Sequence, residues 1–169
     1  MDCNPELIAA AQNNTAKLGF SDRFVLHTGE LADTRFLENL RMEASPVQLV
    51  MANPPWRLVG SGRLPTTEAR RKALFGDKGT FPLFASAASS LLEEDGRFAC
   101  IISPDRLQDM LAALDGAGLT PYLLQYIHKQ KTSPATFVLI EARKGAHAKP
   151  SVAEPIALYG PERFFTLES

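Results

Sequence analysis

The chain alternates between two hydrophobic patterns, and together they predict an α/β fold. Apolar residues recur every three or four positions over 5–17, 34–41, 81–92 and 105–117, a spacing typical of amphipathic helices. Short, mostly apolar runs at 24–27, 47–52, 97–102, 122–128 and 136–141 indicate strands, and a weaker strand is predicted at 156–159. Helices that alternate with strands are typical of a doubly wound sheet.

Turn-forming residues mark where several of these elements begin and end. Asn4 followed by Pro5 is typical of a helix N-terminus, and Gly19 and Gly118 are suited to helix C-termini. The turn 131–134 between the last two long strands is short enough for an antiparallel pair. The polar, glycine-containing stretch 57–79 indicates a loop, with a short helix predicted over 67–74.

Composition narrows the class of protein. The chain has 169 residues, of which 45% are hydrophobic, and this predicts one domain, 1–169, with a real core. Cys3 and Cys100 lack the spacing of metal ligands, and the three histidines form no ligand pattern, so no metal is assigned. With no signal peptide and no membrane-spanning run, we expect a cytoplasmic protein with reduced thiols.

The tetrapeptide Asn53-Pro54-Pro55-Trp56, directly after the run 47–52, is the strongest candidate for chemistry. Its Asn side-chain oxygen and the first Pro carbonyl can each accept one N–H of a planar amino group, which would direct the nitrogen lone pair at a methyl donor. The prolines restrict the backbone, and Trp56 can stack on a substrate ring. The alternative is that Pro-Pro merely ends a strand and Trp56 caps the core.

Two acidic residues near strand ends are candidates for binding a nucleoside cofactor. Asp2 lies where an acid could bind both ribose hydroxyls, and Glu30 could accept from an adenine amino group. Each could also be an ordinary surface acid. A glycine-rich strand–loop–helix, the usual partner of such an acid, does not precede Asp2.

Basic residues follow the tetrapeptide, although the net charge of the chain is only −1. They suit a polyanionic substrate, or form solvated faces. The first stretch contains Arg57, Arg63, Arg70, Arg71, Lys72 and Lys78, and the second contains Lys129, Lys131, Arg143, Lys144 and Lys149.

Four short stretches occur in the order found in class I S-adenosylmethionine-dependent methyltransferases: 2–6, 28–30, 53–56 and 94–98. Within that superfamily the chain most resembles bacterial tRNA(Val) adenine-N6 methyltransferases, through Gly60-Ser61-Gly62-Arg63 and the closing stretch 136–145. The resemblance implies a Rossmann-like sheet and S-adenosylmethionine as the cofactor. It implies Asn53, Pro54, Pro55 and Trp56 at the target amine, and Asp2, Cys3, Glu30, Leu31 and Asn53 at the cofactor.

The chain departs from the family pattern in three places. Trp56 stands where Tyr or Phe is usual, and 79–84 reads more like protein-glutamine or DNA-adenine methyltransferases. The family's first strand and its glycine-rich loop would lie upstream of Met1, so we expect a fragment, a mis-started reading frame or a degenerate relative. Without that strand, 47–52 would have an unpaired apolar edge through which copies could associate.

The sequence therefore favours an N-methyltransferase acting on adenine N6 in tRNA. Arg57, Arg63, Arg70, Arg71 and Lys72 would then hold the RNA backbone. Methylation of a protein glutamine, a DNA adenine or the guanine amino group is the alternative among enzymes. A catalytically inactive module with the methyltransferase fold is the alternative of a different class.

Overall fold

The computed structural model describes residues 1–44, 46–58, 75–145 and 149–159. The chain divides into two compact units, Met1–Glu43 and Ala44–Ser169, which we call unit 1 and unit 2 and describe separately. The helix predicted over 67–74 lies outside the described residues. No helix in the described part is long and apolar enough to cross a membrane.

Unit 1 contains two helices whose first turns are capped by side chains. In α1 (Pro5–Lys17) the Asn4 side chain accepts the Glu6 N–H at 2.9 Å, and the chain leaves the helix through Gly19, which has a φ of 71°. A short 3-10 turn, η1 (Ser21–Arg23), follows. The Asp33 carboxylate caps α2 (Thr34–Ala44), which therefore begins where predicted and runs three residues further than 34–41.

The strand predicted over 24–27 does not form. Unit 1 instead contains one isolated parallel bridge between Asp2 and Thr28, in which the Asp2 N–H donates to His27 at 3.2 Å and the Gly29 N–H donates to Asp2 at 3.2 Å. Residues 24–27 belong to no strand, and the bridge lies just after them, at Thr28. The prediction of a regular strand over 24–27 was therefore wrong.

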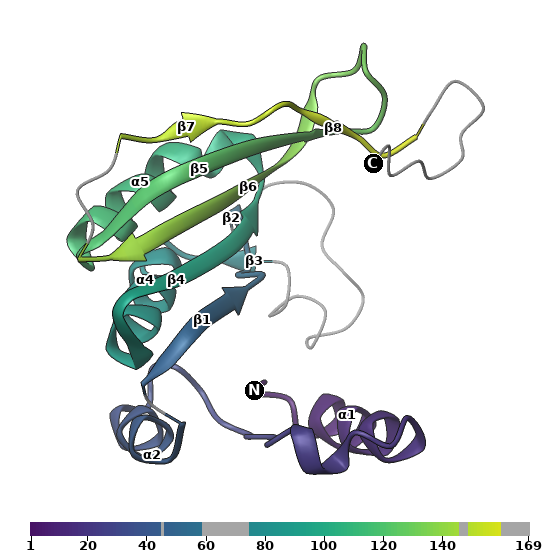
Figure 1. Cartoon of the computed structure of the whole chain (residues 1–169), viewed down its shortest axis with the longest axis vertical. Helices are drawn as coiled ribbons and strands as arrows, with labels where there is room; N and C mark the ends of the chain where they lie inside the picture. Colours follow the sequence, from purple (N-terminus) through teal and green to yellow (C-terminus); the bar gives the residue numbers. More distant parts are fainter. Residues whose placement is uncertain (45, 59–74, 146–148, 160–169) are drawn as a thin grey trace. The chain divides into compact units, whose positions relative to one another are not determined.

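Unit 2 is built on a mixed sheet (Figure 1) with the strand order β1-β4-β6-β5-β7. Its strands are β1 (Val47–Ala52), β4 (Leu92–Ile102), β5 (Leu119–His128), β6 (Ala135–Lys144), β7 (Ser151–Val152) and β8 (Ile156–Ala157). β1 is parallel to β4, whereas β6 is antiparallel to both β4 and β5, which confirms the predicted C-terminal pair. The short β7 and β8 both pair with β5 in parallel, and β7 was not predicted.

Two helices pack against each other and against this sheet. They are α4 (Thr80–Leu91) and α5 (Leu107–Gly116), the second of which follows a 3-10 turn, η2 (Pro104–Arg106). Both α4 and the η2–α5 segment lie within three residues of their predicted bounds. Alternate residues of β4 and β6 join the helices in the core, whose fully buried members include Phe81, Phe98, Ile102, Met110, Leu114, Val138 and Ile140.

β1 is the terminal strand of the sheet. Among the described residues it pairs with β4 alone, and no strand lies along its other edge. The strand carries no charge and no proline, and the side chains of Leu49 and Met51 are 40% and 76% exposed. The expectation of an unpaired, apolar edge is therefore confirmed for the described part of the chain.

Candidate functional site

The Asn53–Trp56 turn begins where β1 ends. β1 and β4 are parallel, and Ala52 pairs with Cys100. The turn therefore lies at the end of the sheet where β4 also ends (Figure 1). The Asn53 side chain is exposed and makes no hydrogen bond within the described part, whereas Pro54 is fully buried. The turn therefore combines a buried residue, Pro54, with an exposed hydrogen-bond acceptor, the Asn53 side-chain oxygen.

Trp56 is half-buried and packs its ring against the sheet. Its centroid lies 6.0 Å from that of Phe137 on β6, with the two rings at 75° to each other. The Arg57 guanidinium lies 5.3 Å from the Trp56 centroid, over the ring. Phe137 thus fixes the orientation of the indole, and the exposed Arg57 covers a face on which a planar group could stack.

A small two-stranded ribbon supports the second half of the turn. Its strands, β2 (Arg57–Leu58) and β3 (Phe75–Gly76), are parallel, and Leu58 pairs with Gly76. A Cβ placed on Gly76 would lie 2.6 Å from the Pro55 carbonyl oxygen and 2.6 Å from Thr80 Oγ1. Only glycine therefore allows this close approach between β3 and the turn.

Arg106 is a further residue at the turn that sequence reasoning missed. Only 3% of it is exposed, and its Nη1 donates to the Trp56 carbonyl at 2.8 Å. In the sequence it falls in the first turn of the predicted helix 105–117, where an arginine is unremarkable. Only the parallel pairing of β1 with β4 brings η2 beside residue 56, so no local signal could have identified Arg106.

The predicted cofactor residues Asp2, Cys3, Glu30 and Leu31 all belong to unit 1. Asp2 is half-buried, and its Oδ1 accepts the Asn4 N–H at 2.8 Å, while its Oδ2 makes no hydrogen bond within the described part. The bridge from Asp2 to Thr28 places the segments that end in Asp2 and in Glu30 next to each other. An oriented carboxylate with a spare oxygen fits a ribose diol, and the exposed Glu30 is a second acceptor.

Four basic residues of the second stretch separate into two pairs at opposite ends of the strands of the sheet. Val138 of β6 pairs with Ile102 of β4, and Ala135 of β6 pairs with His128 of β5. The turn between β5 and β6 therefore lies at the same end of the sheet as Asn53. That turn carries the exposed Lys129 and Lys131. At the opposite end of the sheet, Arg143 Cζ lies 4.6 Å from the centroid of the Tyr122 ring, and Lys144 Nζ donates to the Leu92 carbonyl at 2.8 Å.

Several predicted substrate contacts fall outside the described residues. They are Arg63, Arg70, Arg71 and Lys72, together with the stretch Gly60-Ser61-Gly62. Of that predicted set, Arg57 alone is described, and it lies beside Trp56.

The cysteines and histidines of the described part lie in different surroundings. Burial raises the pKa of the Cys100 thiol to about 12, while Cys3 is exposed, and neither forms a disulfide. The His128 ring is within 2.6 Å of the Ser133 carbonyl oxygen and so holds the turn between β5 and β6. No cluster of three or more side chains suited to a metal ion occurs among the residues described.

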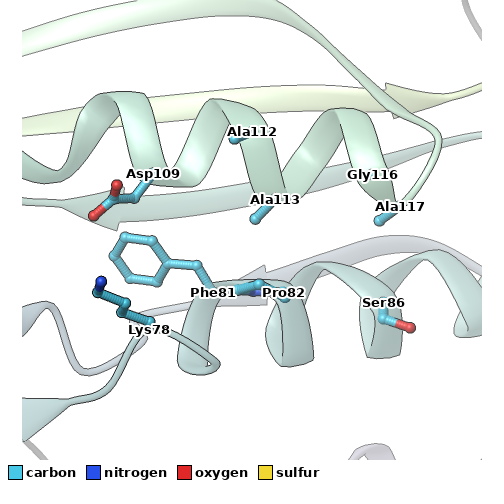
Figure 2. Close-up of a pocket in the computed structure, with 9 residues that line it drawn as sticks. All are labelled: Lys78, Phe81, Pro82, Ser86, Asp109, Ala112, Ala113, Gly116 and Ala117. Carbon is cyan, nitrogen blue, oxygen red and sulfur yellow. The ribbon is translucent and has the colours of Figure 1, made fainter.

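A groove of about 580 Å³ lies between α4 and α5. Lys78 of the first basic stretch is one of its lining residues, whereas none of the candidate catalytic or cofactor-binding residues is. Figure 2 shows Ala113 and Ala117 of the α5 segment on the side toward Pro82 and Ser86 of α4. Phe81 and Asp109, which also contact Arg106, lie near one end of the groove. The groove itself presents mainly small side chains and no set of groups suited to chemistry.

Part of the chain is similar to two curated tRNA methyltransferases. No family model matches the chain. It is 32% identical over 112 residues to the tRNA1(Val) (adenine(37)-N6)-methyltransferases of two Porphyromonas gingivalis strains. The match covers 65% of this chain and 42% of each relative, so the chain spans less than half the length of these curated relatives.

Solved structures identify the fold. A predicted O-methyltransferase from Agrobacterium tumefaciens superposes with a TM-score of 0.71 and 18% identity, over 97% of this chain and 70% of that protein. A family 2 O-methyltransferase from Planctomyces limnophilus, in complex with apigenin, gives 0.53 and 17% over 85% of this chain and 41% of that protein. The chain therefore has the Rossmann-like fold of class I methyltransferases.

Proposed function

We propose that this protein is an S-adenosylmethionine-dependent N-methyltransferase whose target is an exocyclic amino group, adenine N6 in tRNA. The observation that carries the proposal is the Asn53–Trp56 turn at the carboxyl end of β1, where Asn53 is exposed while Pro54 is buried. The 32% identity to tRNA1(Val) (adenine(37)-N6)-methyltransferases supports adenine in tRNA as the substrate. The methyltransferase fold supports the reaction class.

The turn supplies what an exocyclic amine needs to become a nucleophile. The nitrogen lone pair is delocalised into the ring, so the amine is unreactive while it remains planar. Asn53 Oδ1, on an exposed side chain, would accept one of its two N–H groups, and the Pro54 carbonyl, which belongs to a residue that is buried in the free protein, would accept the other once the bound base reaches it. Two such hydrogen bonds favour a tetrahedral nitrogen. Both residues directly follow β1, and the proline ring limits backbone movement at this point.

Asp2 and Glu30 are the residues that would hold the nucleoside part of the cofactor. The free oxygen of Asp2 suits the ribose hydroxyls, and the Glu30 carboxylate suits the adenine amino group. S-adenosylmethionine, when bound, supplies an electrophilic methyl group on its sulfonium. Cys3 and Leu31, the neighbours of these acids in the sequence, would line the same site.

Trp56 and the basic residues at the same sheet edge would hold the RNA. A base extruded from its loop could stack on the Trp56 ring in the position that Arg57 covers. Arg57 and the exposed pair Lys129 and Lys131 are suited to phosphate contacts, since all three lie at the same end of the sheet as the Asn53–Trp56 turn.

Transfer of a radiolabelled methyl group from S-adenosylmethionine to tRNA tests the proposed reaction. Asn53→Ala removes one of the two acceptors, and we expect kcat to fall by about 100-fold or more, as when a transition-state hydrogen bond is lost. Asn13→Ala changes an exposed asparagine of α1 and should leave kcat unchanged.

The acceptor that becomes labelled decides between the alternatives. Label in protein or DNA but not in tRNA would replace the proposed substrate while keeping the reaction class. Failure to transfer methyl to any acceptor, together with no binding of S-adenosylhomocysteine by calorimetry, would indicate an inactive module and overturn the proposed function.

The salt dependence of tRNA binding tests the role of the turn between β5 and β6. Lys129→Gln with Lys131→Gln should weaken binding and make the slope of log affinity against log salt shallower, by roughly 0.7–0.9 for each phosphate that a lysine neutralises in the wild type. The matched control is Arg143→Gln, which removes a positive charge at the opposite end of the sheet and should leave the slope unchanged. Equal slopes in all three proteins would show that Lys129 and Lys131 bind no phosphate.

A further inference from the structure

Arg106 is the one charged side chain in the buried core of the described residues. Removing a guanidinium from water is costly unless its donors find partners. Its Nε donates to Asp109 Oδ2 at 2.7 Å, its Nη1 donates to the Trp56 carbonyl at 2.8 Å, and its Cζ lies 4.5 Å from the centroid of Phe81. These three contacts restrain the guanidinium both in its plane and perpendicular to it.

We propose that Arg106 is a positioning residue for methyl transfer, which holds the second half of the Asn53–Trp56 turn so that its first half keeps a fixed geometry. This inference rests on the proposed function. Arg106 would act through the Trp56 backbone, since its contact with the turn is to a carbonyl and not to the Asn53 side chain.

The composition of the turn explains why such a donor is needed. Pro54 and Pro55 have no N–H, so this stretch of backbone offers more acceptors than donors. The Trp56 carbonyl therefore depends on a donor from elsewhere in the fold, and a cationic donor gives a stronger hydrogen bond than a neutral one. Asp109, which is itself 59% exposed, orients the guanidinium from the start of α5.

The second half of the turn is held from two directions. Arg106 binds the Trp56 carbonyl, and Gly76 approaches the Pro55 carbonyl so closely that a Cβ would not fit. The first half, in contrast, presents an exposed Asn53. Such an arrangement leaves the substrate-facing acceptor available while its backbone is held still, which is the condition for preorganised catalysis.

Tryptophan fluorescence tests the inference independently of activity, because Trp56 is the only tryptophan in the chain. Arg106→Lys keeps the charge but cannot reproduce the planar fork that reaches both Trp56 and Asp109. We expect a red-shifted emission maximum and a larger acrylamide quenching constant, with unchanged far-UV circular dichroism. Arg97→Lys is the matched control. It alters an arginine of β4 that pairs with Glu141 of β6 at 3.2 Å, and it should change neither the emission maximum nor the quenching constant.

Kinetics test the positioning role. A displaced turn should lower kcat of Arg106→Lys by roughly 10- to 100-fold and leave KM for S-adenosylmethionine unchanged. Because inactive protein would lower the apparent kcat in the same way, kcat is calculated per binding-competent site, counted by titration with S-adenosylhomocysteine. If the wild-type chain transfers no methyl group, the proposed function fails, and the fluorescence comparison still decides whether Arg106 holds the turn.

Unchanged emission, quenching and kcat in a folded Arg106→Lys variant would overturn the inference. If the lysine variant does not fold, Asp109→Ala replaces it, because Asp109 is exposed and alanine removes the acceptor of the Arg106 Nε–H. In that case unchanged emission and quenching in Asp109→Ala would overturn the inference.

Discussion

Individual residues near the candidate site differ in how far their surroundings change their chemistry. Cys100 and Cys3 have the same thiol, yet Cys100 is buried in β4 and its pKa is raised to about 12, because burial penalises the thiolate. Cys3 is exposed beside the predicted ribose-binding Asp2. Burial is decided by tertiary packing, so the sequence could name both thiols but could not say which of them is buried.

Cys100 should make the stability of the fold depend on pH in the alkaline range. Its unfolded thiol ionises near the ordinary value of 9.0, while the folded thiol keeps its proton up to about 12. The unfolded chain therefore binds fewer protons between these values, and the free energy of unfolding should fall as pH rises through them. Urea unfolding of wild type and Cys100→Ala at several pH values measures this, since the alanine variant should lose less stability with pH. A parallel decline in both proteins would contradict the prediction.

At the scale of elements, the short ribbon of β2 and β3 matters more than its size suggests. It joins the end of the Asn53–Trp56 turn to the start of α4, and Thr80 Oγ1 accepts the Asp77 N–H at 3.0 Å where the ribbon meets the helix. Neither strand has a hydrophobic pattern long enough to be predicted, because two residues carry no periodicity. The ribbon exists because the flanking elements bring its strands together.

Gly76→Ala should therefore displace the turn and destabilise unit 2. The added Cβ meets a backbone oxygen at 2.6 Å, and we expect the free energy of unfolding to fall by roughly 1–3 kcal/mol, as for other overpacked sites. Gly116→Ala is the matched control: nothing lies within 4 Å of its Cβ, and alanine in a helix should stabilise by up to about 1 kcal/mol. Chemical denaturation of both variants, with Trp56 fluorescence as a probe of the turn, measures the difference. Equal stabilities would show that β3 can move away from Pro55 at no cost.

For the molecule as a whole, the important feature is the edge of β1 along which no other strand of the described residues lies. The strand is parallel to β4, uncharged, and exposes Leu49 and Met51, and it lacks the charges and prolines that often protect sheet edges. The described part of the chain therefore presents unpaired backbone groups along an apolar strand directly before the candidate site. Such an edge favours pairing with a second copy of the chain.

We expect the chain to self-associate in a concentration-dependent way. Met51→Lys places a charge on the exposed side chain of the edge strand and should shift the chain toward the monomer. Met42→Lys changes a methionine that is 85% exposed on the helix α2 and should not. Light scattering coupled to size-exclusion chromatography at several concentrations measures the effect. A wild-type monomer at every concentration would show that the β1 edge does not drive association.

The sequence alone specified those parts of the protein that depend on neighbours along the chain. Helix periodicity with Asn4 at a cap, the apolar run of β1, and the Asn53–Trp56 turn that follows it all rest on local sterics and hydrogen bonding. The alternation of helices and strands likewise indicated the α/β class that the superposition with methyltransferases confirms.

Interactions between distant segments could not be read in this way and depended on tertiary structure. Arg106 reaches Trp56, 50 positions away in the sequence, only because β1 and β4 are parallel. The basic residues of 129–144 lie at two opposite ends of the sheet only because β5 and β6 form an antiparallel pair. The segment 24–27 has the composition of a strand, yet it belongs to no ladder in the described part of the chain, and the isolated bridge lies after it at Thr28. Pairing between strands, which local pattern does not encode, therefore decided what surrounds the candidate turn.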